Sequence, residues 1–252
     1  MLSSLLHYQD VIQRKRLFLY PTLMLKKIAL FSLIFPCTLF ASAFPEPMVF
    51  DLMRGLDAKK GELEINTLMA STFSGNDQHL LINPEIEYAM ANGFAVEIEV
   101  PIDKKPLSTK FGAQYTLTKP SPQFMLGLQA IYEPFFELGR EDFSLSTVIN
   151  LRLREKLSVV SMIGLRDATI NGRNDHYAFI LNITFFYRYS DRLSFGLEND
   201  RNIYYGKEKL KALSIPQVSW RFHPLMKVQS GLGFNWHDNK NIEGYLRVIK
   251  EF

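Results

Sequence analysis

Apolar residues recur at every second position through most of the chain after residue 60. In residues 94–100 the even positions are apolar, whereas Glu97 and Glu99 occupy two of the odd ones. In residues 177–189 every odd position is apolar or aromatic, and tyrosines stand at both ends. A period of two places neighbouring side chains on opposite faces of an extended strand. The pattern therefore predicts an all-β chain.

The alternation predicts about twelve strands, each near the ten residues that a tilted strand needs to cross a membrane. Their expected bounds are 61–72, 79–90, 93–102, 108–118, 122–132, 143–154, 157–166, 175–189, 192–204, 211–222, 226–236 and 241–252. No apolar run after residue 43 has the roughly 20 residues of a helical span. In the tenth segment, Leu213 and Ile215 are out of phase with Val218 and Trp220. We interpret this as a β-bulge near Pro216.

Short and long connections alternate along the chain. Tight turns are predicted at 91–93, 119–121, 155–156, 190–191 and 223–224, and longer polar links at 74–78, 133–142, 167–174 and 205–210. Counted from a periplasmic N-terminus, twelve strands place every tight turn and the C-terminus on the same side, as in outer-membrane barrels. We therefore predict an antiparallel transmembrane β-barrel over residues 61–252, with twelve strands give or take two. A soluble β-sandwich or lipocalin-like barrel, which also alternates, is the alternative.

The chain ends in a further alternating run, formed by Leu246, Val248 and Phe252. A terminal aromatic side chain fits the girdle at the periplasmic membrane surface. Lys250, which interrupts the run, can extend its ammonium to water there. We interpret Leu246, Val248 and Phe252 as the periplasmic C-terminal signal of an outer-membrane barrel. The expected partners are therefore outer-membrane lipid and the barrel assembly machinery.

Residues 24–43 have the three parts of a signal peptide. Lys26 and Lys27 form a basic start, residues 28–40 an apolar centre, and residues 41–43 a cleavage site of small residues. The apolar part is too short for an uncleaved helical span, and Pro36 interrupts it. Residues 1–23 are then an upstream extension, with Met1 and Met24 both open as the start of translation. Export predicts the outer membrane of a Gram-negative bacterium as the location.

Composition changes this picture in two ways. The full chain carries 29 Lys and Arg against 26 Asp and Glu, but five of the basic residues and one acid fall in residues 1–43. The remaining chain has a net charge of −1 and no cysteine, because Cys37 lies in the leader. The basic character belongs to the leader, so no nucleic-acid partner is expected. No metal-ligand spacing or phosphate-binding loop stands out, and we expect no cofactor.

The sequence PEIEY at residues 84–88, a tight turn ending at Gly93 and VEIEVP at residues 96–101 resemble a hairpin of a known outer-membrane family. That family is named for the meta-pathway of phenol degradation, and its members are described as transporters. Residues 110–115, KFGAQY, resemble the segment that follows in the family. The chain departs from the family at Glu87 and Ala89, where an arginine and a glycine are usual. The resemblance implies an outer-membrane barrel of transporter type and no particular solute.

If the apolar positions face lipid, the alternate positions face the interior of the barrel. The acidic interior candidates of the second and third strands are Glu85, Glu87, Glu97 and Glu99. The basic candidates lie toward the periplasmic ends of later strands and are Arg152, Arg154, Arg188, Arg192, Arg221 and Lys227. In a ring of twelve strands, an acidic wall would then face a basic one. Such a transverse field favours small polar or zwitterionic solutes.

Two functions are open at this point. One is a channel or transporter for the passive passage of small solutes, with an unknown small solute as partner. The other is a binding or structural barrel, whose interior is closed by ion pairs and whose outer loops contact a partner. Strand number does not decide between them, since barrels of about eight strands are filled and those of about sixteen are open. Residues 44–60, ahead of the first strand, fit either a periplasmic segment or a plug in the interior.

Some outer-membrane barrels are hydrolases, and four histidines follow the leader: His79, His176, His223 and His237. A lipid hydrolase of this kind needs a serine two residues after a lipid-facing histidine, and the sequence has no His-x-Ser. The dipeptides at 175–176 and 237–238 pair Asp with His, but adjacent strand residues point to opposite faces. We therefore expect no enzyme, with a barrel hydrolase as the alternative.

Overall fold

The computed structural model describes residues 44–49, 53–73, 79–137, 139–170, 173–204, 210–236 and 242–252. Side chains are described for these residues apart from 168–170, 173–176 and 210–211. Residues Leu39–Phe252 form one compact unit. The predicted extension at 1–23 and signal peptide at 24–43 lie outside the described residues. None of the described residues belongs to a helix that is long and apolar enough to cross a membrane.

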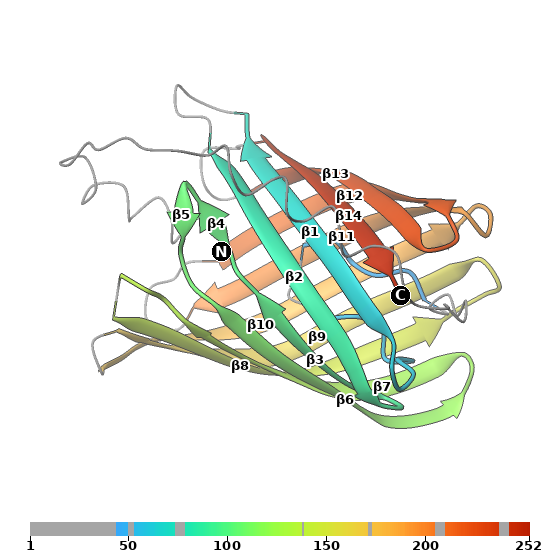
Figure 1. Cartoon of the computed structure of the whole chain (residues 1–252), viewed down its shortest axis with the longest axis horizontal. Helices are drawn as coiled ribbons and strands as arrows, with labels where there is room; N and C mark the ends of the chain where they lie inside the picture. Colours follow the sequence, from blue (N-terminus) through green and yellow to red (C-terminus); the bar gives the residue numbers. More distant parts are fainter. Residues whose placement is uncertain are drawn as a thin grey trace. The chain divides into compact units, whose positions relative to one another are not determined.

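Fourteen strands form a single antiparallel sheet (Figure 1). Two of them, β4 (Ile102–Asp103) and β5 (Lys105–Pro106), make a small hairpin between β3 and β6. The other twelve form the wall: β1 (Leu63–Thr72), β2 (Leu80–Ala91), β3 (Phe94–Glu99), β6 (Lys110–Ser121), β7 (Phe124–Pro134), β8 (Arg140–Arg152), β9 (Leu157–Ile170), β10 (Arg173–Arg188), β11 (Leu193–Tyr204), β12 (Leu210–His223), β13 (Met226–Asn235) and β14 (Ile242–Glu251).

The sheet closes on itself into a barrel. Strand β1 pairs with β2 on one side and with the last strand, β14, on the other. Nine residue pairs, from Glu64 with Glu251 to Thr72 with Glu243, join the first and last strands. Closure gives each of the twelve described wall strands a paired neighbour on both sides, as a wall in lipid requires. The predicted fold class, an all-β antiparallel barrel of twelve strands, is confirmed.

The two faces of the wall differ in the way that the alternation predicts. Large apolar side chains on the outer face are exposed, among them Ile86, Ile98, Leu145, Leu165 and Phe185. The inward positions are buried and carry many polar and charged side chains. The last strand shows the same division, since Leu246 is exposed on the outer face whereas Arg247 is buried on the inner one. This polarity is that of a wall with lipid outside.

Tight turns and longer links alternate around the barrel. The turns between β2 and β3, β8 and β9, β10 and β11, and β12 and β13 overlap the predicted turns. The turn between β6 and β7 lies at residues 122–123, and the predicted turn at 119–121 is strand. In the first turn Gly93 has a φ of 73°, which a side chain disfavours, and an added Cβ would lie 3.0 Å from Thr116 Cβ. On the other side, β9 extends to Ile170 and β10 begins at Arg173. Most of the link predicted at 167–174 is therefore strand.

The bulge predicted near Pro216 is wrong. The pairing of β12 with β11 runs without a shift from Leu213 through Pro216, and its register with β13 is the same on both sides of that proline. The register shift in β12 lies further on, between Trp220 and His223. Leu213 and Ile215 break the apolar pattern because they face inward, where they pack in a cluster with Met48.

Candidate functional site: the interior of the barrel

The inner wall has two unlike halves. The charged half consists of the inward side chains of β13, β14, β1, β2 and β3. Its members include Glu64, Glu85, Glu87, Glu97, Glu99, Lys227 and Arg247, each at most 9% exposed. A buried charge is tolerated only where it is paired and hydrogen-bonded. The partners of these groups therefore decide what the interior can do.

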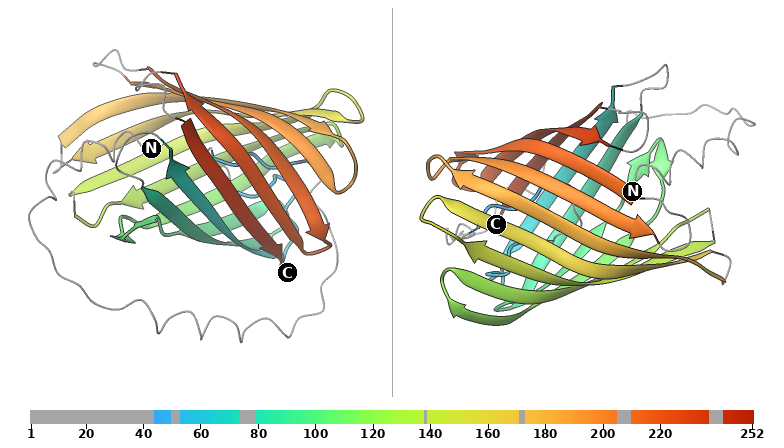
Figure 2. Two further views of the ribbon diagram at one scale, coloured as in Figure 1. Left: turned by 90° about the horizontal axis from the view of Figure 1, so that it is seen from above. Right: turned by 180° about the vertical axis from the view of Figure 1, so that it is seen from behind.

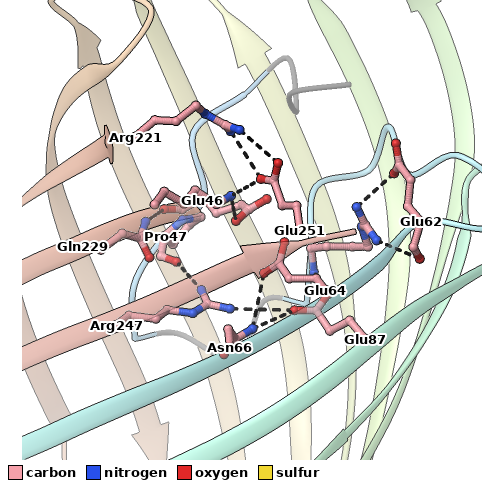
Figure 3. A network of polar contacts seen from close by, with 12 residues as sticks. Glu46, Pro47, Glu62, Glu64, Asn66, Glu87, Arg221, Gln229, Arg247 and Glu251 are labelled. Carbon is pink, nitrogen blue, oxygen red and sulfur yellow. Dashed lines mark hydrogen bonds and ion pairs between the residues drawn. The ribbon is translucent and has the colours of Figure 1, made fainter. Parts of the chain in front are cut away.

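Arg247 is the centre of the charged half (Figure 3). Its Nη2 lies 3.6 Å from Glu85 Oε2 and 3.7 Å from Glu87 Oε1. Its Nη1 donates to the backbone oxygen of Pro47 at 3.2 Å. Asn66 Nδ2 donates to Glu64 Oε1 at 3.3 Å and to Glu87 Oε1 at 3.2 Å. One guanidinium and one amide thus serve three carboxylates and also bind the chain ahead of β1.

Cations on both flanks of the charged half pair with further acids of the interior. On β6, beside β3, Lys110 Nζ lies 3.2 Å from Glu99. On β13, Lys227 Nζ lies 2.7 Å from Glu46 Oε2 and 3.3 Å from Glu251 Oε1. Arg221 of β12 binds the same Glu251 carboxylate at 2.9 Å. The acidic residues are therefore paired mostly with neighbouring strands rather than across the barrel.

The apolar half consists of the inward side chains of β7 to β10, which lie across the ring from the charged half. Six of them belong to one buried cluster: Met125, Val148, Val160, Met162, Ile180 and Phe186. Phe44 and Leu56, from the chain ahead of β1, complete this cluster. Uncharged polar side chains, among them Gln129, Asn150 and Thr184, are also buried on these strands. The described buried Lys and Arg side chains are Lys110 on β6, Lys227 on β13 and Arg247 on β14.

The N-terminal segment, residues 44–60, contacts both halves (Figure 2, blue). Glu46 binds Lys227 through its carboxylate, and its backbone oxygen accepts from Gln229 Nε2 at 2.8 Å. The Glu198 carboxylate of β11 accepts from the backbone nitrogens of Met48 at 2.7 Å and Val49 at 2.9 Å. These contacts fix the first described part of the segment, residues 44–49, against β11 and β13.

The second described part of the segment, residues 53–60, is bound by β2, β6 and β7. Met53 N donates to Gln129 Oε1 at 3.1 Å, and Arg54 N donates to Glu87 Oε2 at 2.6 Å. Gln114 Nε2 donates to the backbone oxygen of Arg54 at 2.8 Å. The backbone oxygen of Leu56 accepts from the Thr116 hydroxyl. Both parts of the segment thus bind inward-facing side chains of the barrel wall.

Glycine at position 127 makes room for the segment. A Cβ added to Gly127 would collide with the side chain of Leu56 and would lie 2.9 Å from the backbone oxygen of Tyr115. Leu56 is 1% exposed. A larger residue at position 127 would occupy the space that Leu56 fills.

Glu46 is held in its ionised form. Burial alone would raise the pKa of its carboxyl, but the attraction of Lys227 and then of Arg247 lowers it to about 2. Paired cations favour the charged form of a carboxyl in this way. The ion pair between Glu46 and Lys227 therefore persists across the ordinary range of pH.

Three carboxylates of the charged half, those of Glu85, Glu87 and Glu97, bring oxygen atoms within 4.8 Å of one another. Carboxylate oxygens are the ligands that hard cations such as Ca²⁺ and Mg²⁺ prefer. The guanidinium of Arg247 already lies beside Glu85 and Glu87. Its positive charge offsets the negative charge of these carboxylates, as a bound metal ion would otherwise do.

The ten charged interior candidates from the sequence occupy three kinds of place. Buried on the inner wall are Glu85, Glu87, Glu97, Glu99 and Lys227. At the inward positions near the strand ends and partly exposed are Arg152, Arg188 and Arg221; exposed in turns are Arg154 and Arg192. Arg152 lies over the ring of Phe44 at 5.0 Å, and Arg188 Nη2 donates to the backbone oxygen of Glu155 at 2.7 Å.

At the C-terminus, Leu246 and Val248 lie on the outer face. The Lys250 ammonium lies 4.4 Å from the centre of the Phe252 ring. The ammonium therefore contacts the terminal aromatic ring.

Sequence reasoning missed Arg247, Glu64 and Lys110 among the charged residues. Parity would have placed Arg247 inward, because it stands between Leu246 and Val248. Sequence reasoning also missed the apolar half, although neighbouring apolar pairs such as Val159 and Val160 indicate a strand that is apolar on both faces. An inward apolar side chain needs a packing partner, and here the partner comes from residues 44–60.

The histidines offer little for hydrolysis among the described side chains. His79 Nδ1 lies 3.6 Å from Asp103 Oδ2, and His223 Nδ1 accepts from the backbone nitrogen of Leu225 at 3.3 Å. The side chain of His176 and the pair at 237–238 lie outside the described residues.

Comparison with known proteins bears on the fold. Residues 42–121 match the family model described as HAEPLYID-like, and this match includes the whole N-terminal segment. No curated protein matches the sequence.

Solved structures resemble the chain closely in shape and weakly in sequence. A KdgM porin has a TM-score of 0.61 at 15% identity, covering 75% of this chain and 99% of the porin. A COG4313 outer membrane channel from Pseudomonas putida F1 has a TM-score of 0.60 at 10% identity, covering 83% and 100%. A NanC porin has a TM-score of 0.57 at 9% identity, covering 75% and 98%. The fold is that of an outer-membrane barrel.

Proposed function

We propose that the chain is an outer-membrane channel for the passive passage of small polar solutes. The observation that carries the proposal is the division of a closed twelve-strand wall into an apolar outer face and a polar, charged inner face. An exposed apolar band suits lipid, and a polar interior suits water and dissolved solutes. No catalytic role is proposed.

The similar structures support the same function. Two of these structures are porins, and the third is an outer membrane channel. One KdgM structure is a complex with oligogalacturonate, a ligand of that porin. The resemblance of residues 84–101 to the phenol-degradation family also points to a transporter. For this chain we propose only the class of small polar or charged solutes.

The interior of the barrel favours polar over apolar solutes. Carboxylates, guanidinium groups and ammonium groups lie side by side on the charged half, as in the contact of Arg247 with Glu85 and Glu87. Fixed charges of both signs at close quarters stabilise dipolar and zwitterionic solutes and hinder apolar ones. A binding or structural barrel is the second candidate, because residues 44–60 bind many inward side chains.

Conductance in planar bilayers tests the channel. Discrete current steps should appear in the full-length protein, either in the wild type or in Glu46→Lys, a variant that breaks the ion pair of Glu46 with Lys227. Arg188→Glu, which reverses an inward charge near the end of β10, should shift the reversal potential in a salt gradient toward cations. Arg201→Glu is the matched control, because Arg201 is exposed on the outer face of β11. If no variant, including Glu46→Lys, conducts current, the chain is a binding or structural barrel and not a channel.

A further inference from the structure

We propose that the segment ahead of β1, described at residues 44–49 and 53–60, is a displaceable plug. These residues are docked in the barrel interior and latched there by the ion pair between Glu46 and Lys227. The inference rests on the proposed channel function and adds how that channel is closed. Three features of the interior carry it: the path of the segment, the independence of the barrel wall from it, and the reversible nature of its anchors.

The path of the segment crosses the interior. Its first described part binds Glu198 of β11 and Lys227 of β13. Its second described part binds Gln129 of β7 and Glu87 of β2. In the ring β13 lies opposite β7, so the segment joins walls that face each other. A chain bound to opposite walls at this level obstructs passage along the barrel.

The barrel wall closes without the segment. The ladder runs from β1 around to β14, and the nine pairs between these two strands complete the ring. The described anchors of the segment are hydrogen bonds with side chains, an ion pair, apolar contacts and a backbone hydrogen bond from Gly93 N, in the turn between β2 and β3, to Ala58 O at 2.8 Å. Displacing the segment therefore breaks no interstrand ladder, and water in the emptied interior can take over its polar contacts.

The apolar half explains why the plug stays docked at rest. Phe44 and Leu56 cover inward apolar side chains of β7 to β10. If the segment left, this cluster would face water, which is unfavourable. The docked state is thus held by apolar burial on one side and by the latch on the other. Reversing the latch charge weakens docking without altering a residue of the wall.

Glu46→Lys tests the plug, because it sets an ammonium against Lys227 and Arg247. Two readouts are needed. The first readout uses a single cysteine, Met48→Cys, in a Cys37→Ser background. Met48 is 3% exposed, so the rate at which a water-soluble methanethiosulfonate labels the cysteine reports where the segment lies. Bilayer conductance reports whether the interior is open. Lys60→Glu, an equal charge reversal at an exposed position of the segment, is the control. A shift between heated and unheated protein on gels checks that each barrel is folded.

In Glu46→Lys, labelling should rise at least about tenfold, because attraction between buried charges is replaced by repulsion, and conductance should rise with it. Lys60→Glu should leave both unchanged. Unchanged labelling in a folded Glu46→Lys barrel would overturn the latch. Wild-type conductance equal to that of Glu46→Lys would overturn the plug while leaving the channel intact. Faster labelling without conductance in any variant would show that the segment leaves and that the proposed channel function fails.

Discussion

The charged half and the apolar half of the inner wall meet the same N-terminal segment, and each binds it by a different kind of force. On the charged half Arg247 holds the Pro47 carbonyl and Lys227 holds Glu46. On the apolar half Phe44 and Leu56 fill a cluster with side chains of β7 to β10. One half requires correct pairing, because a lone buried charge is costly. The other half binds mainly through matching shape and the exclusion of water, with a hydrogen bond from Met53 N to Gln129 Oε1 beside them.

This difference shows what determines each face of a barrel wall. Lipid is uniform, so most outward positions are apolar and the sequence alternates regularly. The interior is not uniform, and the type of each inward residue depends on the groups that it contacts. Where residues 44–60 pack, inward positions such as Val148 and Ile215 become apolar. The local sequence thus reflects a contact with a segment far away in the chain.

The largest effect should come from breaking the charged half at its centre. Arg247→Met removes the guanidinium beside Glu85 and Glu87 and leaves those buried carboxylates without their partner. Breaking a buried ion pair from one side costs about 3–5 kcal/mol. We expect a loss of that size in the free energy of unfolding, measured by guanidinium titration in lipid vesicles with tryptophan fluorescence.

Two further variants make this test specific. Arg201→Met removes an arginine from the outer face of β11, where it is exposed, and should change stability little. Adding Glu87→Gln to Arg247→Met should restore part of the loss, because one carboxylate no longer needs a counter-charge. A loss below about 1 kcal/mol in Arg247→Met, the range of exposed ion pairs, would mean that the charged half is not paired as described.

A smaller effect should follow from loosening the apolar half. Leu56→Ala empties the space above Gly127 and should weaken docking of the segment by about 2 kcal/mol, the lower end of the range for a buried leucine. The lower end applies because the segment can leave the interior rather than hold a cavity. Hydrogen exchange at the Met53 amide, which donates to Gln129, should accelerate accordingly.

The matched control for Leu56→Ala is Leu165→Ala on the outer face, where Leu165 is 62% exposed. It removes the same atoms without touching the segment, so exchange at Met53 should not change. Equal protection of the Met53 amide in Leu56→Ala and in the wild type would show that apolar packing contributes nothing to docking.

The barrel was predictable because its strongest constraint is local. Period two, strand length and turn parity each depend on a few neighbouring residues, and together they predict twelve strands close to the observed bounds. The turn predicted at 119–121 and most of the link predicted at 167–174 are strand instead. At Pro216, the inward Leu213 and Ile215 were interpreted as a bulge. The apolar pattern breaks there because Leu213 and Ile215 pack in a cluster with Met48, which lies more than a hundred residues away in the sequence.

The interior was predictable only in part, for a related reason. Parity places Glu85 and Glu87 inward, but it does not say which cation lies beside them. Arg247 is their partner because closure sets β14 next to β1, a contact between the two ends of the barrel sequence. Lys227 meets Glu46 across a similar separation. Such pairings depend on the closed ring and on the docked segment, which no local pattern encodes.

The smallest expected effect is a pH dependence of docking, which comes from Glu46 on the charged half and not from the apolar half. The pKa of Glu46 is about 2 when docked, against an ordinary value of 4.5, chiefly because Lys227 and Arg247 offset the effect of burial. A lowered pKa stabilises docking fully above pH 4.5, and this contribution is lost as the pH falls from 4.5 toward 2. At pH 4 the linkage relation gives a loss of about 0.8 kcal/mol, or about fourfold in the docking equilibrium.

Glu46→Gln removes that contribution, because glutamine has no carboxyl group to titrate. We expect the Met53 protection factor, corrected for intrinsic exchange, to fall about fourfold more in the wild type than in Glu46→Gln between pH 7 and pH 4. Leu56→Ala retains Glu46 and should show the full wild-type pH dependence on a lower baseline. Parallel profiles in the wild type and Glu46→Gln would mean that the carboxylate of Glu46 does not hold the segment, leaving docking to the apolar half.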